Sequence, residues 1–520
     1  MPSLRSTSPH PSPRATLALC LSLIIALWSL FPPSAAAQFA SSRSTMQPYI
    51  DRVANNITEF TLDNGLNVIV LERHEAPVVS FATYADVGGA DEPDGQTGVA
   101  HFLEHLAFKG TTRIGTRDYE QEAPLLDRLD ELFEQRRAAQ AAGDTAKAEA
   151  LNAEFEQVQQ EAAAIAIQNQ FGQIVEQAGG VGLNAATSAD YTLYTYSLPA
   201  NKLELWMSLE SERFLDPVFR EFFEEQQVIL EERRWRTDNS PIGQMVEAFL
   251  DAAFQVHPYR RPVIGYNEDI RNLTRQNVQD FFDLYYVPNN LTLAIVGDVD
   301  PAQVRQLAEV YFGRYAAKPA PPQVQLVEPP QTAPRSVTLS LDSEPWYLEG
   351  YHRPNGMHPD SMAYDLMASI LSSGRTSRLY KSLVEEQRLA LGAAGYGGFP
   401  GDKFPNLLLF YALTAPGVEL DAVAAALHGE IERLKQERVT ATELERVKKQ
   451  AQAGLLRSLA SNGGMARLLA EYQGKTGSWR NLFDQLTKIE AVTPADIQRI
   501  ARATFRPENK TVGQLIRTQD

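Results

Sequence analysis

A short internal repeat constrains the fold of this chain more than any other feature. The segment Leu273–Thr292 recurs as Val492–Thr511, without a gap and at a constant offset of 219 residues. Each copy predicts a helix, a Pro-Asn turn and a strand, over 291–296 in the first copy and 511–516 in the second. Strands and helices alternate irregularly, and hairpin signals imply antiparallel pairing. The repeat therefore predicts an α+β chain of two similar domains, each a mainly antiparallel sheet with packed helices.

A Pro-rich segment at 316–335 separates the two predicted domains. Clustered prolines favour extended, unpaired backbone, as in a linker. We expect an N-terminal domain at 48–315 and a homologous C-terminal domain at 336–520. The 520 residues are enough for both, since a domain takes roughly 150.

The first part of the N-terminal domain is rich in strand signals. Asn64-Gly65 is a two-residue hairpin signal between the apolar segments 60–62 and 66–71. A further strand is predicted over 78–87, and after several glycines we expect a helix over 99–108.

Residues 119–178 predict a helical-hairpin insertion. They are dense in Ala, Glu, Gln and Leu, and Gly143-Asp144 divides them into two arms. The apolar residues recur at helical spacing on both arms: Leu125, Leu129, Leu132 and Phe133 on the first, and Leu151, Phe155 and Val158 on the second. We favour a solvated structural excursion, and the alternative is a lid or a contact between subunits.

The N-terminus has the pattern of a secretory signal peptide. Residues 1–14 carry two Arg and no acidic residue, residues 15–31 are mostly apolar, and an Ala-x-Ala site ends at Ala37. We therefore expect residues 1–37 to be a signal peptide and the protein to be periplasmic or secreted. The alternative is a retained anchor, which is disfavoured because the apolar run is shorter than the roughly 20 residues that span a bilayer.

Charge and cysteine content exclude several classes of function. The formal net charge of −17 argues against a nucleic-acid partner, because phosphate binding requires a basic surface. The one cysteine, Cys20, lies in the predicted signal peptide, so no disulfide framework and no cysteine-ligated zinc site is expected. Any metal must be bound by histidine and carboxylate.

The segment His101-Phe102-Leu103-Glu104-His105 is the strongest functional signal. On a helix, His101 and His105 lie about 40° apart around the axis, so both imidazoles can reach one ion while Glu104 projects beside it. Zinc binds imidazole and carboxylate, and a catalytic zinc site leaves one position to water, so a third protein ligand is required. The alternative, an ordinary pair of histidines on a helix, is disfavoured by the intervening Glu.

The order His-x-x-Glu-His is that of the inverted zincins. The surrounding residues resemble the pitrilysin/insulinase family of zinc metallopeptidases, in particular bacterial relatives of the beta subunit of the mitochondrial processing peptidase. The resemblance covers most of the chain after the signal peptide and is carried by Gly98–Thr111, Gly179-Gly180, Asn184–Tyr194, Val228–Glu232 and Ser373–Tyr380. It implies a Zn²⁺-dependent endopeptidase.

The resemblance also implies the third ligand. In this family it is a glutamate on a later helix, seven residues after a second acidic residue, which places the ligand at Glu232 and the supporting acid at Glu225. Seven residues are nearly two turns, so these carboxylates share a helix face. A register shift of one leaves Glu231 as the competing ligand. The 127 residues from His105 to Glu232 are more than is usual in the family, and the predicted insertion accounts for the excess.

Substrate contacts are implied for a strand edge and for the second half. In family members the strand that matches Asn184-Ala185 lies beside the metal and pairs with substrate backbone. The alternative is a polar strand start after a Gly-Gly turn. The family also uses an Arg and a Tyr from the second half or from a partner chain, but Arg375, Arg378 and Tyr380 are equally compatible with helix packing.

These observations lead to one functional hypothesis with two rivals. We expect a zinc-dependent endopeptidase in which Glu104 is the general base toward a metal-activated water, acting on peptides or unfolded polypeptides. The resemblance implies a homodimer, or a heterodimer with a metal-free homologue. The rivals are a non-catalytic peptide-binding or scaffold subunit and, less favoured, a zinc-free chamber that acts as a chaperone.

Overall fold

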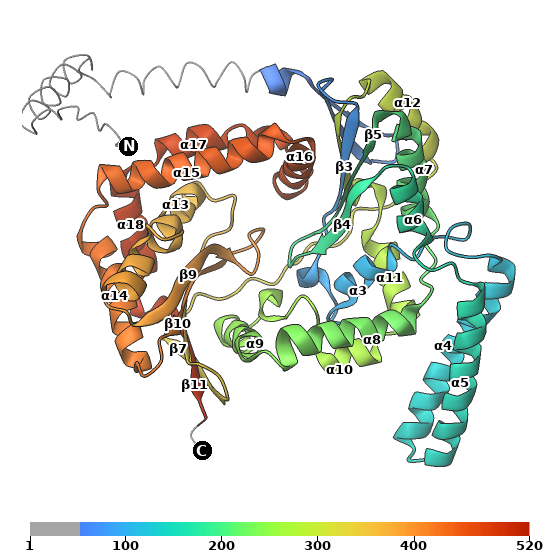
Figure 1. Ribbon diagram of the computed structural model, residues 1–520, viewed down its shortest axis with the longest axis horizontal. Helices are drawn as coiled ribbons and strands as arrows, with labels where there is room; N and C mark the ends of the chain where they lie inside the picture. Colours follow the sequence, from blue (N-terminus) through green and yellow to red (C-terminus); the bar gives the residue numbers. More distant parts are fainter. Residues whose placement is uncertain (1–51, 519–520) are drawn as a thin grey trace, which may run out of the picture. The chain divides into compact units, whose positions relative to one another are not determined.

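The computed structural model describes residues 52–518, so the predicted signal peptide at 1–37 lies outside the described residues. The chain divides into two units, 1–56 and 57–520, and the described part of the first is helical over 52–55. Within the second unit, the described strands form two sheets (Figure 1).

The first sheet is built around the predicted Asn-Gly hairpin. The turn is present, with Gly65 in the left-handed conformation at φ 95°, and joins the first two strands. The strand order of this sheet is β1 (Ile57–Thr61), β2 (Asn67–Glu72), β6 (Leu291–Gly297), β3 (Val78–Ala85), β5 (Thr192–Pro199) and β4 (Val181–Thr187). The β2–β6 pair is parallel and the other neighbours are antiparallel.

The second sheet repeats this order without the first strand. It runs β7 (Arg335–Leu341), β11 (Lys510–Arg517), β8 (Trp346–Arg353), β10 (Asn406–Thr414) and β9 (Ala390–Phe399), with β7–β11 as its parallel pair. The strands of the internal repeat, β6 and β11, therefore take equivalent places in the two sheets. The predicted fold class is confirmed. Residues 316–332 contain neither helix nor strand.

Helices cover both sheets. Those before residue 316 are α3 (Val99–Leu106), α4 (Tyr119–Ala141), α5 (Thr145–Ile165), α6 (Gln170–Gln177), α7 (Leu203–Leu215), α8 (Phe222–Arg233), α9 (Pro241–Ala253), α10 (Asn267–Asn272), α11 (Arg275–Tyr285) and α12 (Pro301–Tyr311). Those of the second half are α13 (Ser361–Ser372), α14 (Leu420–Gln436), α15 (Ala441–Ala460), α16 (Asn462–Thr476), α17 (Gln485–Ala491) and α18 (Pro494–Thr504). Two π-helical segments lie at Arg234–Asp238 and Tyr380–Glu386. Within residues 52–518, no helix has both the length and the apolar character needed to cross a membrane.

The two halves exchange one helix each. α9, from the first half, packs on β7 and β11 of the second sheet, and α16, from the second half, packs on β3 and β6 of the first sheet (Figure 1). Adding the repeat offset of 219 to the residue numbers of α9 gives 460–472, and almost all of these residues lie in α16. The exchange therefore follows the internal repeat, and it buries residues of both halves in one shared apolar cluster that includes Phe249 and Leu348.

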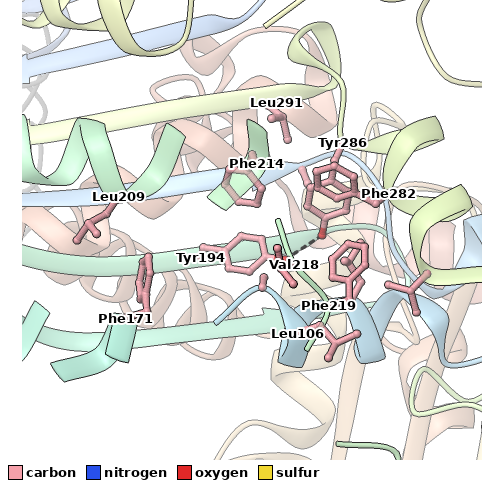
Figure 2. Close-up of a cluster of buried hydrophobic side chains, with 14 of the residues drawn as sticks. Leu106, Phe171, Tyr194, Leu209, Phe214, Val218, Phe219, Phe282, Tyr286 and Leu291 are labelled. Carbon is pink, nitrogen blue, oxygen red and sulfur yellow. Dashed lines mark hydrogen bonds between the residues drawn. The ribbon is translucent and has the colours of Figure 1, made fainter. Parts of the chain in front are cut away.

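The core of the first half lies behind α3. Figure 2 shows Leu106 at the end of α3 with Phe219, Phe282 and the hydrogen-bonded pair Tyr194 and Tyr286, whose hydroxyl oxygens are 2.9 Å apart. These side chains are buried, so α3 rests on a closely packed base.

The predicted hairpin at 119–178 is shorter than expected. α4 and α5 form the hairpin, which ends at Ile165, and α6 follows as a separate helix. Its base is fixed by a buried ion pair between Glu122 of α4 and Arg220, with the Arg220 Nε 2.9 Å from the Glu122 Oε1. Arg220 also donates to the carbonyl oxygens of Lys109, Thr111 and Ile114, so the loop after α3 and the base of the hairpin share one anchor.

Candidate metal centre

The helix that carries the His-x-x-Glu-His segment begins at a glycine and a buried carboxylate. Gly98, the N-cap of α3, has φ 90°, and a Cβ there would lie 2.7 Å from the carbonyl oxygen of Ile264. Glu92 is buried and accepts from the backbone N–H groups of Gly98 and Ala100 at 2.9 and 3.0 Å. A carboxylate at this place accepts hydrogen bonds from N–H groups that have no partner within the helix. Its negative charge also interacts favourably with the positive end of the helix dipole. The start of α3 is therefore fixed.

Three predicted ligands lie together. The Nε2 atoms of His101 and His105 are 3.8 and 3.6 Å from the Glu232 Oε2, and the three donor atoms lie within 4.8 Å of one another. Donor atoms about 2.1 Å from a tetrahedral ion are about 3.4 Å apart, so the spacing is close to that of a zinc site. His101 is buried, whereas His105 and Glu232 are half-buried.

The protonation of His101 suits a metal ligand. Burial lowers the pKa of His101 to about 3, with smaller contributions from His105 and Arg236. The imidazole is therefore neutral near pH 7, which is the form that binds metal. Two imidazoles and one carboxylate form the donor set of many catalytic zinc sites, so the residues present fit zinc.

Glu225, the supporting acid that the family resemblance implies, contacts His105. The Glu225 Oε2 lies 2.9 Å from the His105 Nδ1. Burial lowers the pKa of His105, but the hydrogen bond to Glu225 and the nearby carboxylates outweigh burial and raise it. A proton held on Nδ1 leaves Nε2 as the atom that faces Glu232.

Glu104 has a partner that sequence reasoning did not assign. The Thr187 hydroxyl donates to the Glu104 Oε2 at 2.6 Å. Burial raises the pKa of Glu104, although the bond from Thr187 acts in the opposite direction. A carboxylate with a raised pKa, on the same helix as His101 and His105, is suited to accept and return a proton.

Glu231 and Arg236 complete the surroundings of Glu232. Glu231, the competing ligand, is exposed and pairs with Arg234, with its Oε1 2.7 Å from the Arg234 Nη1. The Arg236 Nη1 lies 2.9 Å from the Glu232 Oε1. Arg236 is one helical turn after Glu232, a spacing that could have indicated this ion pair from sequence.

Asn184 and Ala185 lie in β4, the last strand of the first sheet. β4 packs against α3, and among the described residues its outer side pairs with no other strand. Its inner side pairs with β5 in the register Asn184 to Thr195 and Ala185 to Tyr194. The outer backbone groups of β4 are thus free to pair with an extended chain beside α3.

The Arg and Tyr residues of the second half have local contacts. Arg378 is half-buried and forms a two-point ion pair with Glu443 of α15, at 2.9 and 3.1 Å. Arg375 is exposed, and its guanidinium lies 5.8 Å from the centre of the Tyr380 ring. Helix packing accounts for Arg378, and the contacts found for Arg375 are to Glu385 and Tyr380 of the same half.

Comparisons with protein families define the class. The family model described as insulinase, peptidase family M16, matches residues 67–127 and 163–266. A second model, described as the peptidase M16 inactive domain, matches residues 272–451. The chain therefore belongs to peptidase family M16, the insulinase family. The unmatched residues 128–162 contain most of the α4–α5 hairpin.

Individual relatives agree with this class. The chain is 30% identical over 464 residues to the zinc protease PqqE of Helicobacter pylori, an alignment that covers 87% of this chain and 90% of that protein. It is 21% identical to the uncharacterized zinc protease YmxG of Bacillus subtilis, covering 86% of this chain and 96% of that one.

Solved structures give the same result. A protease from Helicobacter pylori superposes with a TM-score of 0.75 at 28% identity, covering 88% of this chain and 99% of that one. A peptidase M16 inactive domain from Pseudomonas fluorescens has a TM-score of 0.71 at 16% identity, covering 89% and 98%. The second likeness shows the fold alone.

Proposed function

We propose that this protein is a zinc-dependent endopeptidase in which His101, His105 and Glu232 bind Zn²⁺. The observation that carries the proposal is the convergence of these three donor atoms within 4.8 Å, with the Glu104 carboxylate on the same helix as both histidines. Relatives that cover most of this chain are named zinc proteases, which supports the choice of metal. A non-catalytic role is less favoured because no member of this constellation is missing.

The mechanism assigns a role to each side chain. When bound, zinc would lower the pKa of a water molecule toward about 7 and polarise the scissile carbonyl. Glu104 accepts the proton of that water and returns it to the leaving amine, so no covalent enzyme intermediate is needed. Thr187 orients the Glu104 carboxylate, because the Thr187 hydroxyl donates a hydrogen bond to the Glu104 Oε2. Glu225 keeps the proton of His105 on Nδ1.

The β4 edge supplies a place for substrate. An extended peptide that pairs with the outer side of Asn184 and Ala185 would add a strand to the first sheet, next to α3. Such pairing takes its affinity from main-chain hydrogen bonds and depends little on sequence. Peptides and unfolded polypeptides are therefore the proposed substrates.

The remaining proposals concern domains, location and assembly. We infer that residues 1–37 are a signal peptide that directs the protein to the periplasm or outside the cell. We assign the zinc peptidase domain to 48–315, the linker to 316–335 and a domain without a metal site to 336–520. The protein is proposed to act as a homodimer or beside a metal-free homologue.

The test compares unaltered protein with Glu104→Gln. The amide keeps the shape of the side chain but cannot act as a base, so the variant should bind zinc normally and lose at least about 10²–10⁴-fold in turnover. Zinc is measured by elemental analysis of purified protein and turnover with an unstructured peptide, before and after chelation. Near-normal turnover of Glu104→Gln, or cleavage that survives complete metal removal, would contradict the mechanism.

A further inference from the structure

Two acidic side chains at the start of α8 share one lysine. Glu221 is the N-cap of α8 and Glu225 lies one turn later. The Lys109 Nζ is 2.7 Å from the Glu221 Oε2 and 2.6 Å from the Glu225 Oε1. The side chain of Lys109 is 21% exposed and those of both glutamates are 13% exposed. Like charges one turn apart repel, and here the ammonium group lies between them.

Lys109 determines which oxygen of Glu225 is left for the histidine. The Oε1 of Glu225 is occupied by Lys109, and the Oε2 contacts the His105 Nδ1 at 2.9 Å. Both oxygens are thus assigned, which fixes the rotamer of the carboxylate. Because a ligating imidazole takes its orientation from the partner of its other nitrogen, the direction of the His105 Nε2 depends on this rotamer.

The other histidine has no comparable control. The His101 Nδ1 is buried, and no hydrogen-bond partner for it is found among residues 52–518. Its orientation follows from packing alone. Polar control over the pair of imidazoles therefore acts through Glu225.

The backbone around Lys109 and Glu221 has its own support. Glu221 has φ 54°, a left-handed conformation that is unfavourable for a residue with a side chain. Arg220 fastens the loop after α3 by donating to the carbonyl oxygens of Lys109, Thr111 and Ile114. The hydrogen bonds from Arg220 hold this loop without the Lys109 ammonium group. The ion pairs of Lys109 with Glu221 and Glu225 are therefore not needed to hold the loop.

We propose that Lys109 and Glu221 are positioning residues for the metal centre. They hold Glu225 in the orientation that directs the Nε2 of His105 toward Glu232. This inference rests on the proposed function, because it assumes that His105 binds zinc. It assigns the Lys109, Glu221 and Glu225 ion pairs, here called the brace, a role in metal affinity.

The test measures zinc affinity in variants of the whole protein, by competition with a chromogenic chelator. Lys109→Met should weaken zinc binding by about 10–100-fold, the usual effect of removing support behind a ligand. Lys109→Arg keeps the charge and should restore most of the affinity. Glu221→Asn removes one carboxylate, and Asn tolerates left-handed backbone, so affinity should fall without loss of folding. Lys147→Met, at an exposed position of α5, is the matched control.

Thermal unfolding of the metal-free proteins separates positioning from folding. The brace is supported if Lys109→Met unfolds near the temperature of Lys147→Met yet binds zinc more weakly, and if Lys109→Arg rescues. Unchanged zinc affinity in Lys109→Met, or a loss that Lys109→Arg does not rescue, would overturn it. If the unaltered protein binds no zinc, both the proposed function and the role of the brace are rejected. If the unaltered protein binds zinc tightly and Lys109→Met binds it equally well, only the role of the brace is rejected.

Discussion

Glu232 uses its two carboxylate oxygens for different partners. Its Oε2 faces the Nε2 atoms of both histidines, and its Oε1 pairs with Arg236 at 2.9 Å. Glu231, the next residue, points to solvent and pairs with Arg234. Neighbouring residues on a helix project about 100° apart, so only one of the two can face the histidines.

A set of three Gln variants tests this register. Glu232→Gln should abolish zinc binding, because an amide oxygen replaces an anionic ligand. Glu225→Gln should weaken zinc binding or activity by about 10–100-fold. Glu231→Gln, the control at the adjacent position, should bind zinc as the unaltered protein does. Elemental analysis after gel filtration measures all three, and loss of zinc from the Glu231 variant alone would show that the third ligand is misplaced.

Helical spacing explains which site residues could be predicted. His101, Glu104 and His105 lie within one turn or so of each other, and α3 brings them to one side. Glu225 and Glu232 required a resemblance to a family, because sequence spacing cannot say that α8 packs against α3. Thr187 lies 83 residues after Glu104, and their contact depends on how β4 packs against that helix. No local pattern predicts such a contact.

Among the secondary-structure elements, α15 shows how one residue serves both a helix end and a tertiary contact. Glu443 is the N3 residue of a capping box with Thr440, and it also pairs with Arg378. Partial burial raises the pKa of Glu443, but the bonds from Arg378 and Thr440 outweigh it and lower the pKa to about 2. Because the folded state favours the ionised form, this carboxylate stabilises the protein above its unfolded pKa of about 4.5, and the contribution is lost as the pH falls toward 2.

Glu443→Gln isolates the ion pair, since glutamine is also suitable in a capping box. At pH 7 the variant should lose about 1 kcal/mol of stability, a value reduced for solvent screening because Glu443 is partly exposed. The difference from the unaltered protein should shrink steadily below pH 4.5. Thermal unfolding across this pH range measures it, and a difference that stays constant down to pH 2 would show that the charge of Glu443 is irrelevant.

The contact between α16 and the first sheet depends on a glycine. A Cβ on Gly474 would overlap the ring of Tyr84, which is fully buried in β3 and stacks on Tyr191 at 5.1 Å. Gly474→Ala should therefore destabilise the protein by about 1–3 kcal/mol. Gly429→Ala, in α14 with open space around it, should instead stabilise by about 0.5–1 kcal/mol. Equal effects in denaturant unfolding would contradict a close approach at Gly474.

The exchange of α9 and α16 is the part of the fold that sequence did not predict. The repeat and the Pro-rich segment predict two similar halves, and the two sheets have the same strand order. An apolar helix face shows that a helix must pack on something, but not on which sheet. These contacts between the halves are consistent with one compact unit that contains residues 57–518.

At the scale of the whole molecule, the position of β4 at the end of the first sheet is the basis for the proposed choice of substrate. The proposed binding edge requires a segment with free main-chain N–H and C=O groups over several residues, next to α3. Folded proteins satisfy these groups internally and present few such segments. We therefore expect selection by flexibility more than by sequence.

A matched pair of substrates tests this expectation. One is a disordered peptide of a few tens of residues, and the other is a compact, stable domain that contains the same segment. The zinc-loaded enzyme should cut the peptide at several sites and leave the domain intact until it is denatured, as followed by mass spectrometry. The same domain with a destabilising core substitution should be cut at a rate that rises with its unfolded fraction, because cleavage then follows the population of the open form. Equal rates for the peptide and the stable domain would exclude binding by strand addition to β4, while the assignment of the zinc ligands would stand.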